Sequence, residues 1–132
     1  MTTVRALVID DSRTMRSLLS RQLVALGYET LQAANGQEAL EAMEQAGTDV
    51  PALATVDWNM PVMDGLTFVQ RVRTRAEWRS MSLMMVTTEA EYDQIVRALA
   101  AGAHEYLIKP FTQEAFVDKL QLLGLVPDRA AS

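Results

Sequence analysis

Five polar residues stand at the ends of four short apolar runs in the sequence. Asp10 and Asp11 follow the run Ala-Leu-Val-Ile, and Asp57 follows Leu-Ala-Thr-Val. Thr87 follows Leu-Met-Met-Val, and Lys109 follows Tyr-Leu-Ile. If these runs are strands of one parallel sheet, their carboxyl ends lie along a single edge, where such folds bind ligands. The spacing therefore predicts a polar site in which three carboxylates meet beside one lysine.

The charges of these residues indicate what the site could do. Three carboxylates held close together repel one another and raise their own pKa values unless a cation neutralises them. Oxygen ligands with no His or Cys nearby suit Mg2+, which keeps several waters and takes only one or two carboxylates directly. Lys109 can then hold a phosphate oxygen as a point charge, and the Thr87 hydroxyl can donate a hydrogen bond to another. Mg2+-dependent phosphate chemistry is the prediction.

Each of these residues has a simpler interpretation when it is taken alone. A single Asp at a strand end is most often a helix cap or part of a solvated turn. Lys109 alone is most often a surface lysine, and Thr87 alone a strand or cap residue. Because all five stand at the ends of strands of one predicted sheet, their combination favours a functional site.

The elements that must position these residues can be predicted from the alternation of apolar runs and helical periods. This alternation is typical of an α/β fold built on a parallel sheet. We predict a flavodoxin-like, doubly wound (βα)5 fold with strand order 2-1-3-4-5, in which the first and third strands are neighbours. The predicted strands are residues 4–9, 28–33, 52–56, 83–86 and 105–108.

Capping residues predict where the helices begin and end. Gly27 follows the apolar positions of the first helix and suits a left-handed C-terminal stop. Thr88 and Glu91 have the spacing of a capping box for the fourth helix. The side chains expected to cap the second, third and fifth helices are Asn35, Asp64 and Thr112.

Length and composition predict one domain, residues 1–124, followed by a short tail, residues 125–132. The chain has 132 residues, of which 49% are hydrophobic and 22% charged. Its net charge of -5 disfavours a nucleic-acid partner. No apolar run approaches the roughly 20 residues that span a bilayer, and no signal-peptide pattern is present. The lack of cysteine is compatible with a reducing compartment. We therefore expect a cytoplasmic monomer.

Three other features have structural interpretations. His104 is the only histidine and is expected to be a surface residue, because no second His or Cys offers a metal partner. The methionines Met81, Met84 and Met85 are expected to fill the core. A solvated basic patch is the expectation for the four arginines Arg71, Arg73, Arg75 and Arg79.

The site residues and their surroundings resemble the receiver domains of two-component signalling, over residues 4 to about 123. The matching motifs are the pair Asp10-Asp11, the segment from Asp57 to Gly65, the Thr87 strand end and Lys109-Pro110-Phe111. Within that family the chain is most similar to the stand-alone chemotaxis regulators. The resemblance implies a phosphoacceptor switch that undergoes only self-catalysed phosphorylation and dephosphorylation, and is not otherwise an enzyme.

The resemblance also implies a role for each matching residue. Asp57 is implied to be the phosphoacceptor, and Lys109 and Thr87 to contact the phosphoryl group. Asp11, Asp57 and the main-chain carbonyl of Asn59 are implied to bind Mg2+, with Asp10 acting through a metal-bound water. Thr87 and Tyr106 correspond to the family's switch pair, and the Lys109-Pro110 peptide bond is a candidate for the cis form.

The implied partners are a histidine kinase as phosphodonor and a downstream protein that binds the surface of the fourth helix, fifth strand and fifth helix. The flagellar motor switch is one candidate target. Two departures from the family pattern bear on this. Thr88 stands where many receivers have Ala or Gly, and Glu91 and Tyr92 stand where motor-binding members have lysines, although Lys119 matches.

Three alternatives remain open from the sequence. The chain could be a receiver or phosphorelay module of another signalling pathway. A haloacid dehalogenase-type phosphatase also uses Asp, Mg2+, Thr and Lys, but its general acid would be an Asp where this chain has Asn59. A flavodoxin-like electron carrier is disfavoured because Asp10 and Asp11 would repel the flavin phosphate.

Overall fold

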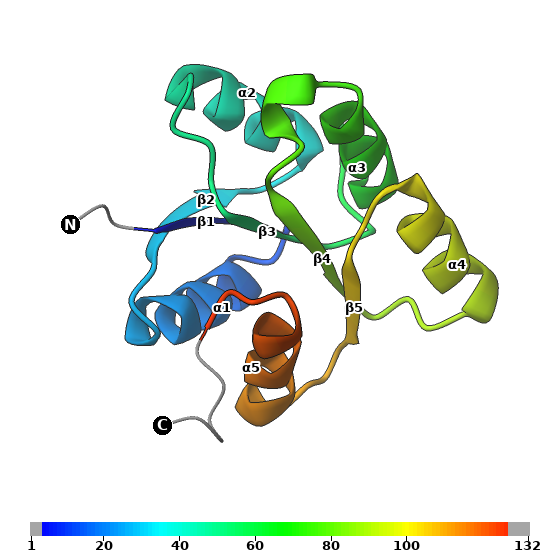
Figure 1. Ribbon diagram of the computed structural model, residues 1–132. Coiled ribbons are helices and arrows are strands. Elements are labelled where there is room, and N and C mark those ends of the chain that lie inside the picture. Colours follow the sequence, from blue (N-terminus) through cyan, green and yellow to red (C-terminus); the bar gives the residue numbers. More distant parts are fainter. Residues whose placement is uncertain (1–3, 127–132) are drawn as a thin grey trace.

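The computed structural model describes residues 4–126 (Figure 1). The predicted tail lies outside this range except for residues 125 and 126. Five parallel strands form one sheet in the order β2-β1-β3-β4-β5, which confirms the predicted topology. The strands are β1 (Arg5–Ile9), β2 (Glu29–Ala33), β3 (Leu53–Val56), β4 (Ser82–Thr87) and β5 (Glu105–Ile108).

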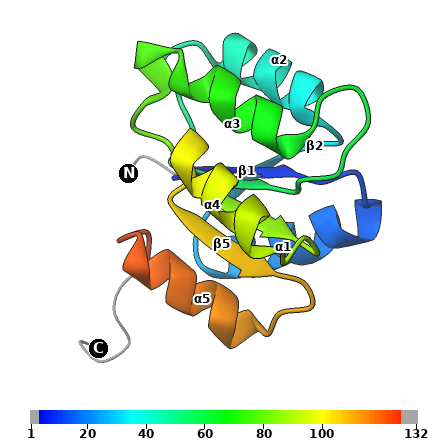
Figure 2. The same ribbon diagram turned by 90° about the vertical axis from the view of Figure 1, so that its right-hand side faces the viewer.

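Helices cover both faces of the sheet. On one side lie α1 (Arg13–Ala25) and α5 (Gln113–Leu122), and on the other lie α2 (Gly36–Ala46), α3 (Gly65–Arg73) and α4 (Tyr92–Ala101) (Figure 1). A short 3-10 helix, η1 (Ala76–Trp78), follows α3. In the turned view, α4 lies between α3 and α5 (Figure 2).

The strands divide their side chains between two hydrophobic cores, because successive residues of a strand point to opposite faces. Leu7 and Ile9 of β1 join the core under α2, α3 and α4. Ala6 and Val8 join the core under α1 and α5. The predicted core methionines Met81, Met84 and Met85 are fully buried.

The register aligns the carboxyl ends of the strands. Ile9 pairs with Val56, Val56 with Met85, and Thr87 with Ile108. The residues at these positions or directly after them therefore meet at the same edge of the sheet. Among the residues that the structure describes, no helix is long and apolar enough to cross a membrane.

Most of the predicted helix caps are confirmed. Asn35, Asp64 and Thr112 accept hydrogen bonds from main-chain N–H groups at the starts of α2, α3 and α5. Gly27 follows the end of α1 with a φ of 98°. Ser12, which the sequence analysis did not single out, caps α1 by accepting from Met15 N at 3.2 Å.

The predicted capping box at Thr88 is wrong. Helix α4 begins only at Tyr92, after Glu91, whose side chain makes no capping hydrogen bond. The main chain of Glu89, before α4, forms hydrogen bonds with Thr87 and Tyr106. The N–H of Glu89 donates to Thr87 Oγ1 at 3.3 Å, and its carbonyl accepts from Tyr106 Oη at 2.6 Å. Because these bonds hold residue 89 in the loop, the helix starts later than the sequence pattern predicts.

Candidate metal and phosphoryl site

The sheet continues by one main-chain hydrogen bond beyond its strands, and these bonds fix the site. Asp10 N donates to Ala33 O at 3.1 Å, and Asp57 N donates to Ile9 O at 3.0 Å. At the other end of the row, Lys109 N donates to Thr87 O at 2.9 Å. The backbones that carry the predicted site residues are therefore held with the rigidity of the sheet.

The three predicted carboxylates do meet. Asp10, Asp11 and Asp57 each offer an oxygen, and these oxygens lie within 4.8 Å of one another. Asp10 and Asp57 are buried, with 1% and 8% of their surface exposed, whereas Asp11 is exposed. The group thus has a buried floor and one accessible carboxylate.

Lys109 is the cation that faces this group. Its Nζ lies 2.7 Å from Asp10 Oδ2 and 3.6 Å from Asp57 Oδ2. The other oxygens of the two carboxylates accept main-chain N–H groups, Ser12 N on Asp10 and Trp58 N on Asp57, at 2.9 and 2.8 Å. One ammonium offsets only part of the charge of three carboxylates, so the site retains an excess of negative charge.

Burial raises the pKa of the Asp57 carboxyl above its ordinary value. Lys109 opposes this shift and Asp10 adds to it, while the Thr87 hydroxyl and the Trp58 N–H lower the pKa. A cation that enters the site stabilises the charged form of a carboxylate that is poorly hydrated and close to a second carboxylate.

Gly65 allows the loop after β3 to close over the site. A Cβ at this position would lie 2.1 Å from the main-chain oxygen of Asp57, so no other residue fits without moving the backbone. Gly65 N also donates to Trp58 O at 2.9 Å. The Asp57–Gly65 segment that carries the sequence motif is therefore a compact turn packed on the phosphoacceptor candidate.

Thr87 and Tyr106, the predicted switch pair, are both joined to residue 89. Thr87 is fully buried, and Tyr106 is 9% exposed with its ring in the hydrophobic core. The Oγ1 of Thr87 accepts from Glu89 N, and Tyr106 Oη donates to Glu89 O. Burial and the nearby carboxylates of Glu89 and Asp57 raise the pKa of Tyr106 to about 12, so the phenol keeps its proton and remains a donor.

Asn59 lies in the loop after β3. Its side-chain Nδ2 donates to Glu89 Oε1, which ties this loop to the loop before α4. The predicted cis peptide bond between Lys109 and Pro110 is present. Thr88 is exposed beside the buried Thr87.

Two residues at the site were missed from the sequence. One is Glu89, which contacts the nearby Thr87 and also Asn59 and Tyr106, which lie far from it along the chain. The other is Arg16, whose Nη1 donates to Asp10 O at 2.7 Å while its Nε donates to Gln32 Oε1 at 3.3 Å. A signal for Arg16 did exist, because a cation in the first turn of a helix is disfavoured by the helix dipole and calls for a specific partner.

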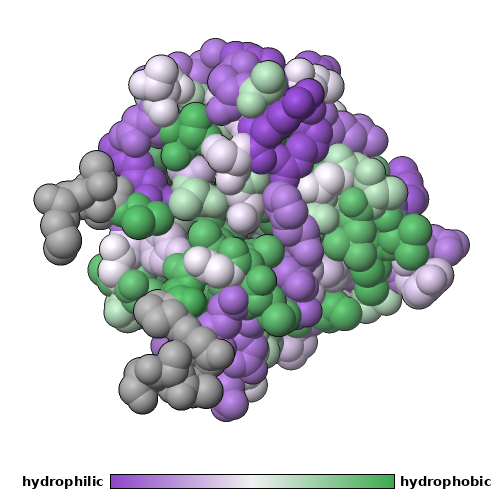
Figure 3. All heavy atoms as spheres, viewed as in Figure 1, coloured by the Kyte–Doolittle hydropathy of each residue, from purple (hydrophilic) through white to green (hydrophobic). Residues whose placement is uncertain are grey.

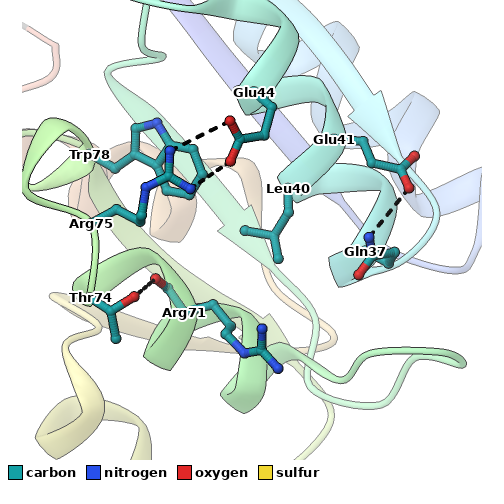
Figure 4. A pocket seen from close by; sticks show the side chains of 8 residues that line it. All are labelled: Gln37, Leu40, Glu41, Glu44, Arg71, Thr74, Arg75 and Trp78. Carbon is teal, nitrogen blue, oxygen red and sulfur yellow. Dashed lines mark hydrogen bonds and ion pairs between the residues drawn. The ribbon is translucent and has the colours of Figure 1, made fainter.

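A cavity lies between α2 and α3, away from the carboxylate group (Figure 4). It has a volume of about 350 Å³ and includes none of the predicted site residues. Arg75 reaches across it to Glu44 and stacks on the Trp78 ring, 4.1 Å from the ring centre. The polar site is thus an acidic group at the sheet edge that is separate from this cavity.

The chain matches proteins of known family over most of its length. Residues 6–121 match the response regulator receiver domain. The chain is 40% identical over 121 residues to the chemotaxis protein CheY1 of Helicobacter pylori, covering 91% of this chain and 96% of that relative. It is 34% identical over 119 residues to the chemotaxis protein CheY of Pseudomonas aeruginosa, covering 89% and 94%. The structure of the chemotaxis response regulator CheY4 of Vibrio cholerae is similar, with a TM-score of 0.84 and 35% identity, covering 92% of this chain and 99% of that chain.

These relatives bear out the family that the sequence motifs indicated. Proteins of this family are signalling switches rather than conventional enzymes, and the named relatives act in chemotaxis. The chain therefore belongs to the response regulator receiver domain family.

Proposed function

We propose that this receiver is a chemotaxis switch in which Asp57 accepts a phosphoryl group from a histidine kinase. The observation that carries the proposal is the buried Asp57 carboxylate, 3.6 Å from Lys109 and grouped with Asp10 and Asp11. Membership of the receiver family argues against the phosphatase and electron-carrier alternatives. A receiver module of another pathway would share the chemistry and differ in its partners.

The donor set fits a hard divalent cation. All the clustered ligand atoms are carboxylate oxygens within 4.8 Å of one another, and neither His nor Cys belongs to the group. Asp11, Asp57 and the main-chain carbonyl of Asn59 would hold Mg2+, with Asp10 beside them. When bound, Mg2+ would supply positive charge to the phosphoryl oxygens during transfer.

The residues of the chain itself place the nucleophile and offset charge. An oxygen of the Asp57 carboxylate forms a bond to phosphorus as the bond from phosphorus to the donor's leaving group breaks, and the leaving group departs with that electron pair. Lys109 neutralises an oxygen of the phosphoryl group, and the Thr87 hydroxyl donates a hydrogen bond to another. Hydrolysis of the resulting acyl phosphate returns the carboxylate and inorganic phosphate.

The new charge acts on the loop at residue 89. A phosphoryl group adds about -1.5 to -2 charges, which attract the Thr87 hydroxyl and the Lys109 ammonium. A shift of the Thr87 side chain toward the phosphoryl group would weaken the hydrogen bond that its Oγ1 accepts from Glu89 N, and Glu89 also holds Tyr106 by its carbonyl. Thr87 and Tyr106 therefore both act through Glu89. Phosphorylation shifts the loop at residue 89 from the arrangement with these two hydrogen bonds toward one without them.

The affected surface can bind a protein. Hydrophobic side chains gather over α4 (Figure 3), and Tyr92, Val96 and Leu99 of this helix are 78%, 45% and 44% exposed. On the adjoining elements, Lys119 of α5 pairs with Glu105 of β5 at 2.8 Å. We propose that the downstream partner binds this α4-β5-α5 surface, with the flagellar motor switch as one candidate.

Capture of partners tests this assignment. The chain phosphorylated with acetyl phosphate should retain a protein that neither the untreated chain nor an Asp57→Ala control retains. Tyr106→Ala should still accept phosphate, because the Oη of Tyr106 donates to Glu89 O, outside the carboxylate group, but should lose the partner. A folded Tyr106→Ala variant that cannot be phosphorylated would instead place Tyr106 in the chemistry and contradict these roles.

A further inference from the structure

The guanidinium of Arg73 is bound at the amino ends of β4 and β5, at the edge of the sheet opposite the carboxylates. Arg73 is the last residue of α3. Its Nε donates to Gly102 O at 3.0 Å, its Nη2 to Met81 O at 3.2 Å and its Nη1 to Arg79 O at 3.4 Å. The prediction that all four arginines form a solvated patch is therefore wrong for Arg73. Its side chain joins α3 to the loops that precede β4 and β5.

The loop between α4 and β5 is shaped to receive this arginine. Gly102 has a φ of 125°, a conformation that side chains rarely adopt. A Cβ on Gly102 would lie 2.5 Å from Arg73 Cγ. The loop therefore packs directly on the aliphatic part of the arginine, while its carbonyl accepts from the guanidinium.

His104, two residues after Gly102, contacts the same guanidinium. Its Nδ1 accepts from Leu83 N at 3.0 Å and lies 3.2 Å from Arg73 Nη2. In a regular parallel ladder, Leu83 N–H would donate to a main-chain carbonyl of the next strand. The carbonyl of Gly102 is taken by Arg73, and the imidazole supplies the acceptor to the buried Leu83 instead.

Both groups that face Nδ1 are donors, and this fixes the state of the ring. An imidazole nitrogen that accepts a hydrogen bond carries no proton, so His104 is neutral with its proton on Nε2. Arg73 of α3 is the charged side chain that acts on the ring, while β4 presents the main chain of Leu83. On β5, the neighbouring Glu105 is paired with Lys119 of α5. His104 is exposed at the surface, as predicted, but partial desolvation of its ring against the loop and the charge of Arg73 lower its pKa.

We propose that His104, Arg73, Gly102 and Leu83 form a proton-operated latch, the His104 latch, which fastens the α4–β5 loop while the imidazole is neutral. Protonation of Nδ1 removes the acceptor of Leu83 N–H and sets an imidazolium against the guanidinium. The α4–β5 loop then loses one of its hydrogen bonds to β4 and gains a repulsion from Arg73, while the main-chain bond from His104 N to Leu83 O at 2.8 Å remains. Since this loop joins α4 to β5, the latch would make the proposed partner-binding surface sensitive to pH at a site remote from Asp57.

The effect on stability has a defined sign. The pKa of His104 in the folded chain lies below its ordinary value of 6.5, so the unfolded chain takes up the proton first as the pH falls. The contribution of the latch to stability is therefore complete above pH 6.5 and is lost as the pH falls through the pKa of the folded state. Each unit between the two pKa values corresponds to a tenfold loss in the folding equilibrium constant.

Because His104 is the only histidine, one NMR titration of the unphosphorylated chain tests the latch directly. The imidazole should carry its proton on Nε2 at neutral pH and titrate below 6.5. The amide signals of Leu83 and Gly102 should shift with the same midpoint. Arg73→Met should move the midpoint upward. A ring protonated on Nδ1 at neutral pH, a midpoint at or above the ordinary value, or amides that do not follow the ring would overturn the proposal.

A matched pair of variants separates the latch from other titrating groups. His104→Asn places an amide oxygen near the position of Nδ1 and cannot titrate, whereas His104→Ala removes the acceptor. From about pH 8 to pH 5, the wild type should lose stability relative to His104→Asn, and His104→Ala should be less stable than both at the upper end. Parallel curves for the wild type and His104→Asn would contradict a proton-operated latch. Phosphorylation of Asp57 plays no part in these measurements, so their outcome is independent of the proposed function.

Discussion

At the scale of single residues, the site is defined by one lysine that lies unequally close to the two buried carboxylates of the group, Asp10 and Asp57. Lys109 lies 0.9 Å closer to Asp10 than to Asp57, from distances of 2.7 and 3.6 Å. Asp57, the less well paired of the two buried carboxylates, is the one whose pKa burial raises. A bound cation should therefore stabilise the Asp57 carboxylate more than that of Asp10, and Asp57 is the carboxylate more available to an activated phosphoryl group.

Binding of Mg2+ to the unphosphorylated chain follows from this excess of negative charge. The fluorescence of Trp58, which is buried and whose main-chain N–H donates to Asp57 Oδ1, should change on addition of Mg2+. Affinity should fall as the pH is lowered, because protons compete for the carboxylates. The raised pKa of Asp57 moves this loss to a higher pH than an ordinary Asp would give.

Substitution of the second tryptophan, Trp78, provides the control for the fluorescence measurement. Trp78 lines the cavity between α2 and α3, so Trp78→Phe should keep the fluorescence response and Trp58→Phe should lose it. Asp11→Ala and Asp57→Ala should each weaken binding strongly. A response that survives both aspartate substitutions would place the metal elsewhere.

At the scale of the elements, the loop between β3 and α3 contains a strained residue. Val62 has a φ of 68° and is 83% exposed. A β-branched residue in the left-handed region is destabilising by about 1–2 kcal/mol, whereas Asn tolerates that conformation better. Val62→Asn should therefore raise the free energy of unfolding by about 1 kcal/mol in urea denaturation. The control is Val24→Asn, at an exposed position in a regular helix, which should not raise the free energy of unfolding. If Val62→Asn brings no gain over this control, Val62 is not strained.

The segment after α5 also contributes to the fold. Leu125 N donates to Leu120 O at 2.9 Å, and Tyr28 Oη donates to Leu125 O at 2.5 Å. Leu125 and Val126 both pack against the core under α1 and α5. Ending the chain after Gly124 should therefore lower the free energy of unfolding by about 2 kcal/mol.

Truncation after Val126 is the matched control for that loss, because it keeps these contacts. Both truncated chains would be compared with the full chain by thermal and urea unfolding. Equal stability of the two truncated chains would mean that the contacts of Leu125 and Val126 contribute nothing measurable.

At the scale of the whole molecule, the strands and the sheet-edge site could be predicted because they leave local patterns in the sequence. The strand order leaves no local pattern and was predicted from the flavodoxin-like class of doubly wound folds. An apolar run predicts a strand, and the Asp, Thr or Lys that follows it marks the carboxyl end of that strand. The late start of α4 could not be predicted, because it depends on Tyr106 contacting residue 89. The roles of Arg73 and His104 were missed for the same reason, since their partners are main-chain groups from other elements and leave no periodic signal.

The whole account depends on Asp57 being the phosphoacceptor, and intact-mass spectrometry after incubation with acetyl phosphate tests this most directly. No kinase should be needed, because the nucleophile, Lys109, Thr87 and the predicted metal ligands belong to one chain. The wild type with Mg2+ should gain one phosphoryl group that hydroxylamine removes, as expected for an acyl phosphate. The adduct should be absent with a chelator and absent from Asp57→Asn, which keeps the shape of the side chain without the nucleophile. Equal labelling of Asp57→Asn, or an adduct that resists hydroxylamine, would contradict the proposed mechanism.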